Sequence, residues 1–118
     1  MEVNYERAVE QWQSYVATIQ DDGWAIVEAP ESEECPDGVF IEDAVVVYRG
    51  TALITNPGND ARKPEIVGLE QVFKLLGCNI AHIKAPGTLD GGDVLKVGDT
   101  IYVGQSGRTN EEGIQQLA

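Results

Sequence analysis

Two pairs of carboxylates stand immediately before apolar segments of the chain. Asp90 and Asp93 flank a glycine pair before one such segment, and Glu42 and Asp43 precede another. Glycine lets the backbone bend tightly and approach a ligand closely, so acids beside it can be aimed at one cation. Asp-Gly-Gly-Asp also occurs in ordinary turns and in calcium loops, and adjacent acids also occur in capped turns. The motifs alone leave these alternatives open.

The elements expected to position these acids follow from hydrophobic periodicity. Apolar residues recur at helical spacing from Asn4 to Asp22 and again over 64–76, and a third helix is expected to begin near Asn110. Strands are predicted at 24–29, 40–48, 51–55, 79–83, 94–97 and 100–103. The turns at 49–50 and 98–99 predict two hairpins.

The two predicted hairpins are copies of one repeat. A shift of 49 residues places Val45 on Val94 and Thr51 on Thr100, and each hairpin is followed by a predicted helix, so the unit is ββαβ. In both copies the acid pair stands at the entrance of the first strand. Because equivalent strand entrances in a repeated architecture tend to converge, we predict that the two acid pairs form one site.

Composition restricts the partners of such a site. The 118 residues carry a net charge of −12, which repels phosphate backbones and anionic membrane surfaces, so neither nucleic acid nor membrane is expected as a partner. No apolar run reaches the eighteen or so residues of a membrane span, and the first residues do not form a basic region leading to an apolar one. A cytoplasmic protein is therefore expected. Cys35 and Cys78 have no metal-ligand spacing, so reduced thiols, no metal and no cofactor are expected.

Four motifs occur in a recognisable order: Phe-Ile-Glu-Asp at 40–43, Thr-Asn-Pro-Gly at 55–58, Ala-Pro-Gly-Thr-Leu-Asp-Gly-Gly-Asp-Val at 85–94 and Gly-Arg-Thr-Asn-Glu-Glu-Gly at 107–113. They resemble the dimethylarginine dimethylaminohydrolases, within the guanidine-modifying superfamily of arginine deiminases and amidinotransferases. The resemblance implies an α/β (α+β) fold, an incomplete αβ propeller with a little over two ββαβ units. Residues 1–29 would end one unit, 30–83 form a complete unit and 84–118 begin the next, all within one partial domain.

The resemblance also implies a reaction. A cysteine thiolate attacks the central carbon of a methylated guanidinium, a histidine protonates the departing amine, and water hydrolyses the thiouronium intermediate to give citrulline. The cation must be held still meanwhile. A planar guanidinium offers N–H donors in a fork that matches carboxylate oxygens, and such charge-assisted bonds are strong.

By resemblance, the cationic end of the substrate is bound by Asp37, Glu42 and Asp43. Asp90 occupies the position that orients the catalytic histidine. The α-carboxylate end is bound by Arg62 and Arg108. Acids at one end and two arginines at the other describe a zwitterionic guanidino amino acid. The competing interpretation of both arginines is a solvated surface cation or a surface ion pair. For Asp93 a structural role is favoured, in which its side chain bonds backbone N–H groups of its own loop.

The family's catalytic histidine and cysteine have no match in the chain. His82 is the only histidine and does not stand at the catalytic position. Acidic neighbours disfavour the thiolate form of Cys35, and Cys78 is expected to be a buried small residue. We therefore expect part of a dimethylarginine hydrolase that is inactive alone. The alternatives are a non-catalytic guanidino-compound binding module, and a structural module that self-associates or pairs with a complementary chain through open strand edges.

Overall fold

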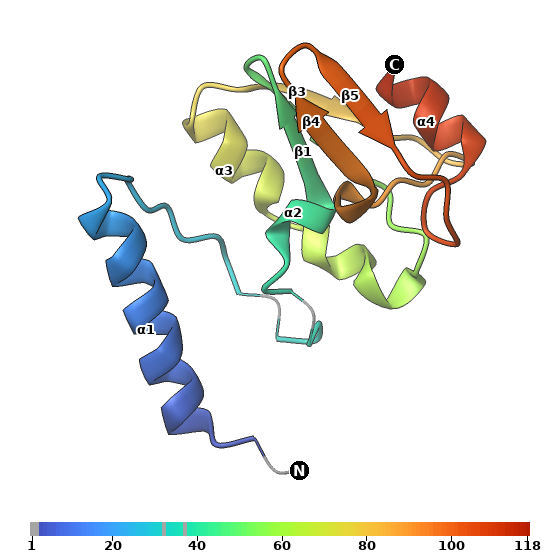
Figure 1. Ribbon diagram of the computed structural model, residues 1–118. Helices are drawn as coiled ribbons and strands as arrows, with labels where there is room; N and C mark the ends of the chain where they lie inside the picture. The colour runs from blue at the N-terminus through green and yellow to red at the C-terminus, as the bar shows by residue number, and fades with distance from the viewer. Residues whose placement is uncertain (1–2, 32, 37) are drawn as a thin grey trace.

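The computed structural model describes residues 3–31, 33–36 and 38–118 (Figure 1). Its helical elements are α1 (Tyr5–Asp21), α2 (Ile41–Ala44), the 3-10 helix η1 (Asp60–Ile66), α3 (Leu69–Leu75), the 3-10 turn η2 (Gly91–Asp93) and α4 (Glu111–Leu117). Its strands are β1 (Val45–Tyr48), β2 (Thr51–Ile54), β3 (Asn79–His82), β4 (Val94–Val97) and β5 (Thr100–Val103). In the described part of the chain no helix is long and apolar enough to cross a bilayer.

The first helix is confirmed, but the strand predicted after it is wrong. Asn4 caps α1 by accepting the Arg7 N–H at 2.9 Å. Figure 1 shows α1 standing apart from the sheets, and none of its residues is buried. Residues 24–29 belong to the extended connection that follows α1. Their alternating apolar residues favour an extended backbone, but a strand also needs a neighbouring strand for its N–H and C=O groups, and none of the described strands pairs with this segment.

The two hairpins and their 49-residue repeat are confirmed. β1 and β2 pair antiparallel with Val45 opposite Ile54, and β4 and β5 pair in the same way with Val94 opposite Val103. β3 adds to β2 in parallel after the α3 crossover. The hairpins lie side by side (Figure 1), and the Lys96 Nζ donates to the Val47 carbonyl at 3.0 Å.

Each hairpin is preceded by a helical turn rather than by strand. The sequence predicted strand from residue 40, but the Asp43 N–H donates to the Phe40 carbonyl at 3.1 Å and closes α2. η2 occupies the equivalent place before β4. The two turns pack together: a Cβ on Gly91 would lie 1.8 Å from the carbonyl oxygen of Glu42, so only glycine fits there.

The helix predicted over 64–76 is two elements, η1 and α3. Gly68 separates them with a φ of 83°, a left-handed conformation that glycine adopts without strain. The break has a functional consequence, because η1 begins earlier than predicted and carries Arg62.

The core lies on both faces of the first sheet. Side chains of a strand alternate between faces, and Val45 packs in one apolar cluster with Leu69 of α3, while Val46 packs in another with Leu89. β1 is therefore covered on both sides. This fixes the orientation of α2, which leads directly into it.

Candidate active site

The two helical turns bring Asp43 and Asp90 to one place. The Asp90 Oδ1 accepts the Gly92 N–H at 2.9 Å, and the Asp90 N–H donates to the Thr109 hydroxyl at 3.1 Å. The backbone around Asp43 is fixed by the Thr55 hydroxyl, which donates to the Asp43 carbonyl at 3.2 Å. Both carboxylates therefore lie on turns whose backbone conformation is set by hydrogen bonds.

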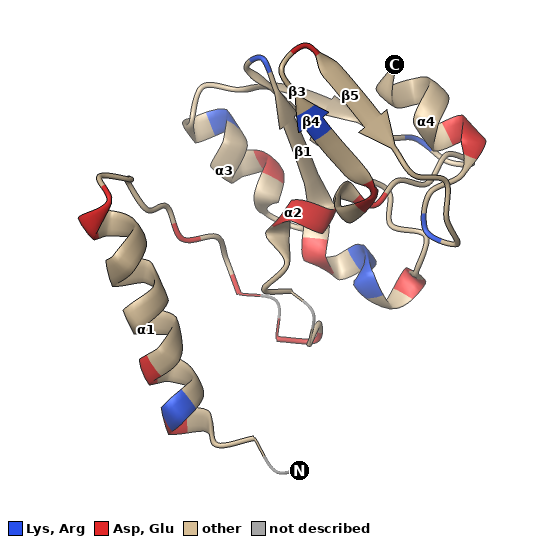
Figure 2. Cartoon of the chain, viewed as in Figure 1, with Lys and Arg blue, Asp and Glu red and all other residues tan. Residues whose placement is uncertain are grey.

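Arg62 of η1 joins these acids. Its Nη1 lies 2.8 Å from Asp43 Oδ2 and 3.7 Å from Asp90 Oδ2. Its Nε and Nη2 each donate at 2.8 Å to one oxygen of Glu65. Figure 2 shows this meeting of acidic α2 with the charged residues of η1. Arg62 is 7% exposed, so its guanidinium is held inside the protein by three carboxylates.

Arg108 contacts the same group from the loop after β5. Its Nη1 lies 3.5 Å from Asp90 Oδ2, and its side chain is 57% exposed. Its loop lies close to the loop after β2. A Cβ on Gly58 would be only 2.9 Å from the Arg108 Cα. A small pocket opens between loop 57–59 and the charged side chains.

Asp93 supports this loop. Its Oδ2 accepts the hydroxyls of Ser106 and Thr109, each at 2.6 Å. The structural role predicted for Asp93 is confirmed, but its partners are hydroxyls of the Arg108 loop rather than backbone of its own turn.

The charges of the cluster do not balance. Ionised Asp43, Glu65 and Asp90 supply three negative charges against two positive ones from Arg62 and Arg108. Burial raises the pKa of Asp90 above its usual range, and the charge of Asp43 adds to this, while the Gly92 N–H and Arg62 oppose it. The hydrogen bonds that Arg62 donates to Glu65 raise the pKa of Arg62, with Asp43 contributing, so Arg62 stays charged. With all three acids ionised the cluster carries one net negative charge, which a further cation or a proton on Asp90 would balance.

The structure brings together four of the residues named from the sequence: Asp43, Arg62, Asp90 and Arg108. Glu42 is exposed and meets the site through its carbonyl against Gly91. Asp37 lies outside the described residues. Sequence reasoning missed Glu65, although its place three residues after Arg62 on a helical segment was a signal for an ion pair.

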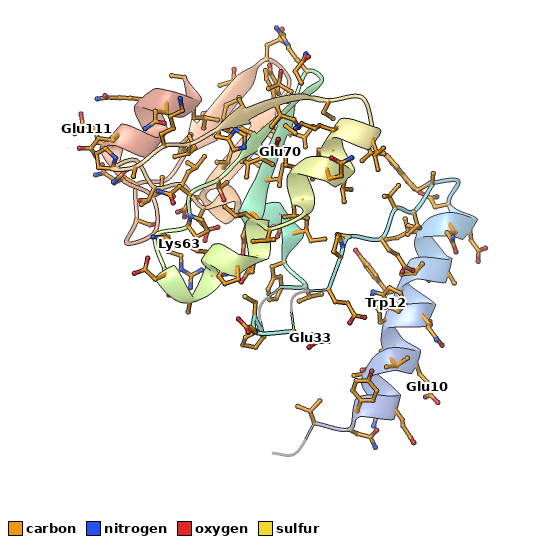
Figure 3. The ribbon with its side chains drawn as sticks, turned by 180° about the vertical axis from the view of Figure 1, so that it is seen from behind. Glu10, Trp12, Glu33, Lys63, Glu70 and Glu111 are labelled. Carbon is orange, nitrogen blue, oxygen red and sulfur yellow. The ribbon has the colours of Figure 1, made fainter. Side chains whose placement is uncertain are left out.

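The histidine and the cysteines lie elsewhere. His82 of β3 pairs with Glu70 of α3 at 2.8 Å and is half-exposed, in agreement with a surface role. Figure 3 labels Glu70 on α3 and Lys63 on η1, the element before it. The Cys35 thiol is buried and donates to the Ala61 carbonyl at 3.6 Å, and Cys78 packs against the first core cluster. Among the described residues no group of three or more histidine, cysteine or acidic side chains is placed to hold a metal ion.

A family model described as "N,N dimethylarginine dimethylhydrolase, eukaryotic" matches residues 1–118. The chain belongs to the dimethylarginine dimethylaminohydrolase family. It is 53% identical over 115 residues to the dimethylarginine dimethylaminohydrolase of Streptomyces coelicolor, and 38% identical over 115 residues to that of Pseudomonas aeruginosa. The alignments cover 98% and 97% of this chain and 45% of each relative, so the chain spans about half the length of these relatives.

Solved structures agree with the family. The P. aeruginosa dimethylarginine dimethylaminohydrolase in complex with citrulline superimposes with a TM-score of 0.89 at 37% identity, over 97% of this chain and 45% of that one. The N-terminal domain of ArgZ, a cyanobacterial arginine dihydrolase, gives 0.84 at 24% identity over 97% and 43%, which shows a shared fold alone. The mixed α/β fold expected from the sequence is confirmed.

One feature differs from the arrangement that the family resemblance implies. Acids at one end of a substrate and arginines at the other would keep the two charges apart. Here Asp43 and Arg62 are in direct contact, because η1 lies against α2. In this chain the Arg62 guanidinium therefore already pairs with Asp43, the carboxylate expected to hold the ligand.

Proposed function

We propose that the chain forms part of the substrate site of a hydrolase that converts methylated arginine and water to citrulline and a methylamine. Asp43 binds the guanidinium of the ligand, with Glu42 and Asp37 contributing. Arg62 and Arg108 bind the α-carboxylate. Asp90 orients a catalytic histidine that the family supplies and this chain does not match. The thiouronium intermediate forms on the family's catalytic cysteine, which likewise has no match in this chain.

One observation carries this proposal. Asp43 and Asp90, which come from two copies of a repeat, meet two arginines at one pocket, and Asp43 already accepts a guanidinium N–H at 2.8 Å. The geometry thus suits both charges of a guanidino amino acid. The citrulline complex of the P. aeruginosa relative is consistent with such a ligand.

Titration of the ¹⁵N-labelled chain with dimethylarginine, followed by NMR, tests this. We expect shifts of the amide signals around Asp43, Asp90 and Arg62. Asp43→Asn removes a charge-assisted bond to the cation, so the affinity falls roughly ten- to a hundredfold. Asp99→Asn is the matched control, since Asp99 pairs with Arg49 at the exposed hairpin turns. An equal loss of affinity in both variants, or no binding by the unaltered chain, contradicts the proposal.

A further inference from the structure

Glu65 has no role in the resemblance, yet it makes the largest set of contacts to Arg62. We propose that Glu65 is a positioning residue that fixes Arg62 so that only its Nη1 edge meets the ligand, and thereby selects ligands that carry a carboxylate. This proposal rests on the proposed function for the ligand, and on the Glu65–Arg62 geometry for the mechanism.

The fork between the two residues leaves Arg62 a single free edge. A guanidinium has five N–H donors, one on Nε and two on each terminal nitrogen. Glu65 takes Nε and Nη2 with its two oxygens, each at 2.8 Å. The Nη1 then points at Asp43 and Asp90, at 2.8 and 3.7 Å. A planar group held along one edge cannot rotate, so the direction of Nη1 is set by Glu65.

Burial strengthens the paired hydrogen bonds between Glu65 and Arg62, which we call the clamp. The side chains of Arg62 and Glu65 are only 8% and 5% exposed. Withdrawing two charges from water is costly unless their hydrogen bonds are well made, and a paired guanidinium in such a place has little freedom to find other partners. An exposed arginine such as Arg108 has no comparable restraint.

The clamp also determines how a ligand can enter. A ligand carboxylate that takes the Nη1 hydrogen now paired with Asp43 displaces that acid, and the displaced Asp43 then needs a cation. A zwitterion supplies both replacements, whereas a ligand with a cationic end alone leaves the Arg62 edge without its partner. Selection for a carboxylate therefore depends on Nη1 keeping its direction, which Glu65 provides.

The clamp can be measured without any ligand. The exchange rate of the Arg62 Nε proton with water, followed by NMR in the 118-residue chain, reports the Glu65 contact directly. We expect slow exchange in the unaltered chain and at least tenfold faster exchange in Glu65→Gln. Glu65→Asp keeps the charge but is one methylene shorter, so it is expected to lose the fork while preserving the fold. Asp43→Asn, which alters only the Nη1 contact, and Glu70→Gln, which removes an acid on α3 paired with Lys74 and His82, are expected to leave the rate within twofold.

The selectivity is measured with L-arginine and agmatine, which lacks the α-carboxylate. We expect the unaltered chain to prefer L-arginine, and the two Glu65 variants to lose about tenfold of that preference, through weaker L-arginine binding. Glu70→Gln is expected to keep it.

The two measurements separate the possible failures. Unchanged Nε exchange in both Glu65 variants, or equal acceleration in Glu70→Gln, overturns the clamp. Fast exchange with an unchanged preference overturns the selection. If the unaltered chain binds neither ligand, the proposed function fails for the chain and selection fails with it, while the exchange rates still decide whether Glu65 holds Arg62.

Discussion

At the scale of single residues, the site is set by the imbalance between three acids and two arginines. Among these acids Asp90 has a raised pKa, because it is buried and lies beside the charge of Asp43. Folding therefore favours its protonated form. The stability that Asp90 contributes is greatest at acid pH, and it is lost as the pH rises from the ordinary pKa of an aspartate to the raised one.

Removing the Asp43 charge is expected to lower the pKa of Asp90. In Asp43→Asn one repulsive neighbour disappears, and Arg62 Nη1, no longer paired at 2.8 Å, becomes available to Asp90. A ¹³C NMR titration of the Asp90 carboxyl carbon measures the change. Asp99→Asn, at the exposed turn of the second hairpin, serves as the control and is expected to leave the Asp90 titration unchanged. An Asp90 pKa that stays the same or rises in Asp43→Asn would contradict this contribution of the Asp43 charge.

At the scale of elements, the site depends on the close packing of α2 against η2. A Cβ on Gly91 would lie 1.8 Å from the Glu42 carbonyl oxygen and 2.9 Å from its carbon, both backbone atoms. Gly91→Ala must push the two turns apart, which separates Asp43 from Asp90. We expect the free energy of unfolding to fall by about 1–3 kcal/mol or more, as measured by urea denaturation. Gly107→Ala is the matched control, since a Cβ there meets nothing within 4 Å. Equal unfolding midpoints for the two variants would refute this account of the turn.

Elements with strong local signals were predictable from the sequence. The hairpins follow from their turn residues and the 49-residue repeat, and α1 follows from its periodicity and its cap at Asn4. The errors lie where tertiary contacts decide. Residues 40–44 resemble a strand in composition but close a helical turn against η2, and 24–29 have the pattern of a strand without a described partner.

The residues of the site were predicted better than the contacts between them. Convergence of the acids follows from the repeat, and family motifs point to both arginines. The contact of Arg62 with Asp43 was not predictable, because it depends on the tertiary packing of η1 against α2. Glu65 was missed because the helix was predicted to begin at residue 64 rather than at 60. Arg62 therefore lay outside the predicted helix, and the two residues were not recognised as neighbours on one helical segment.

At the scale of the whole molecule, the described residues bring the proposed binding groups together, and the histidine and the buried cysteine lie away from them. The one histidine, His82, pairs with Glu70 of α3, and Cys35 is buried against the Ala61 carbonyl. Neither contributes to the pocket lined by Asp43, Arg62 and Asp90. A thiolate and a proton donor must both lie within reach of the guanidinium carbon for the proposed reaction.

We therefore expect the 118-residue chain by itself to release no citrulline from dimethylarginine above a control without protein, in a colorimetric citrulline assay run to long times. Binding without turnover is the expected outcome, since the carboxylates and arginines can hold a ligand that nothing attacks. Cys35→Ser and Cys78→Ser distinguish the remaining alternative. Citrulline release that either substitution abolishes would identify a nucleophile within the chain, and the pocket would then have to open toward that cysteine during the reaction. Release that neither abolishes would point to a contaminating hydrolase, which the Asp43→Asn variant exposes by leaving the rate unchanged.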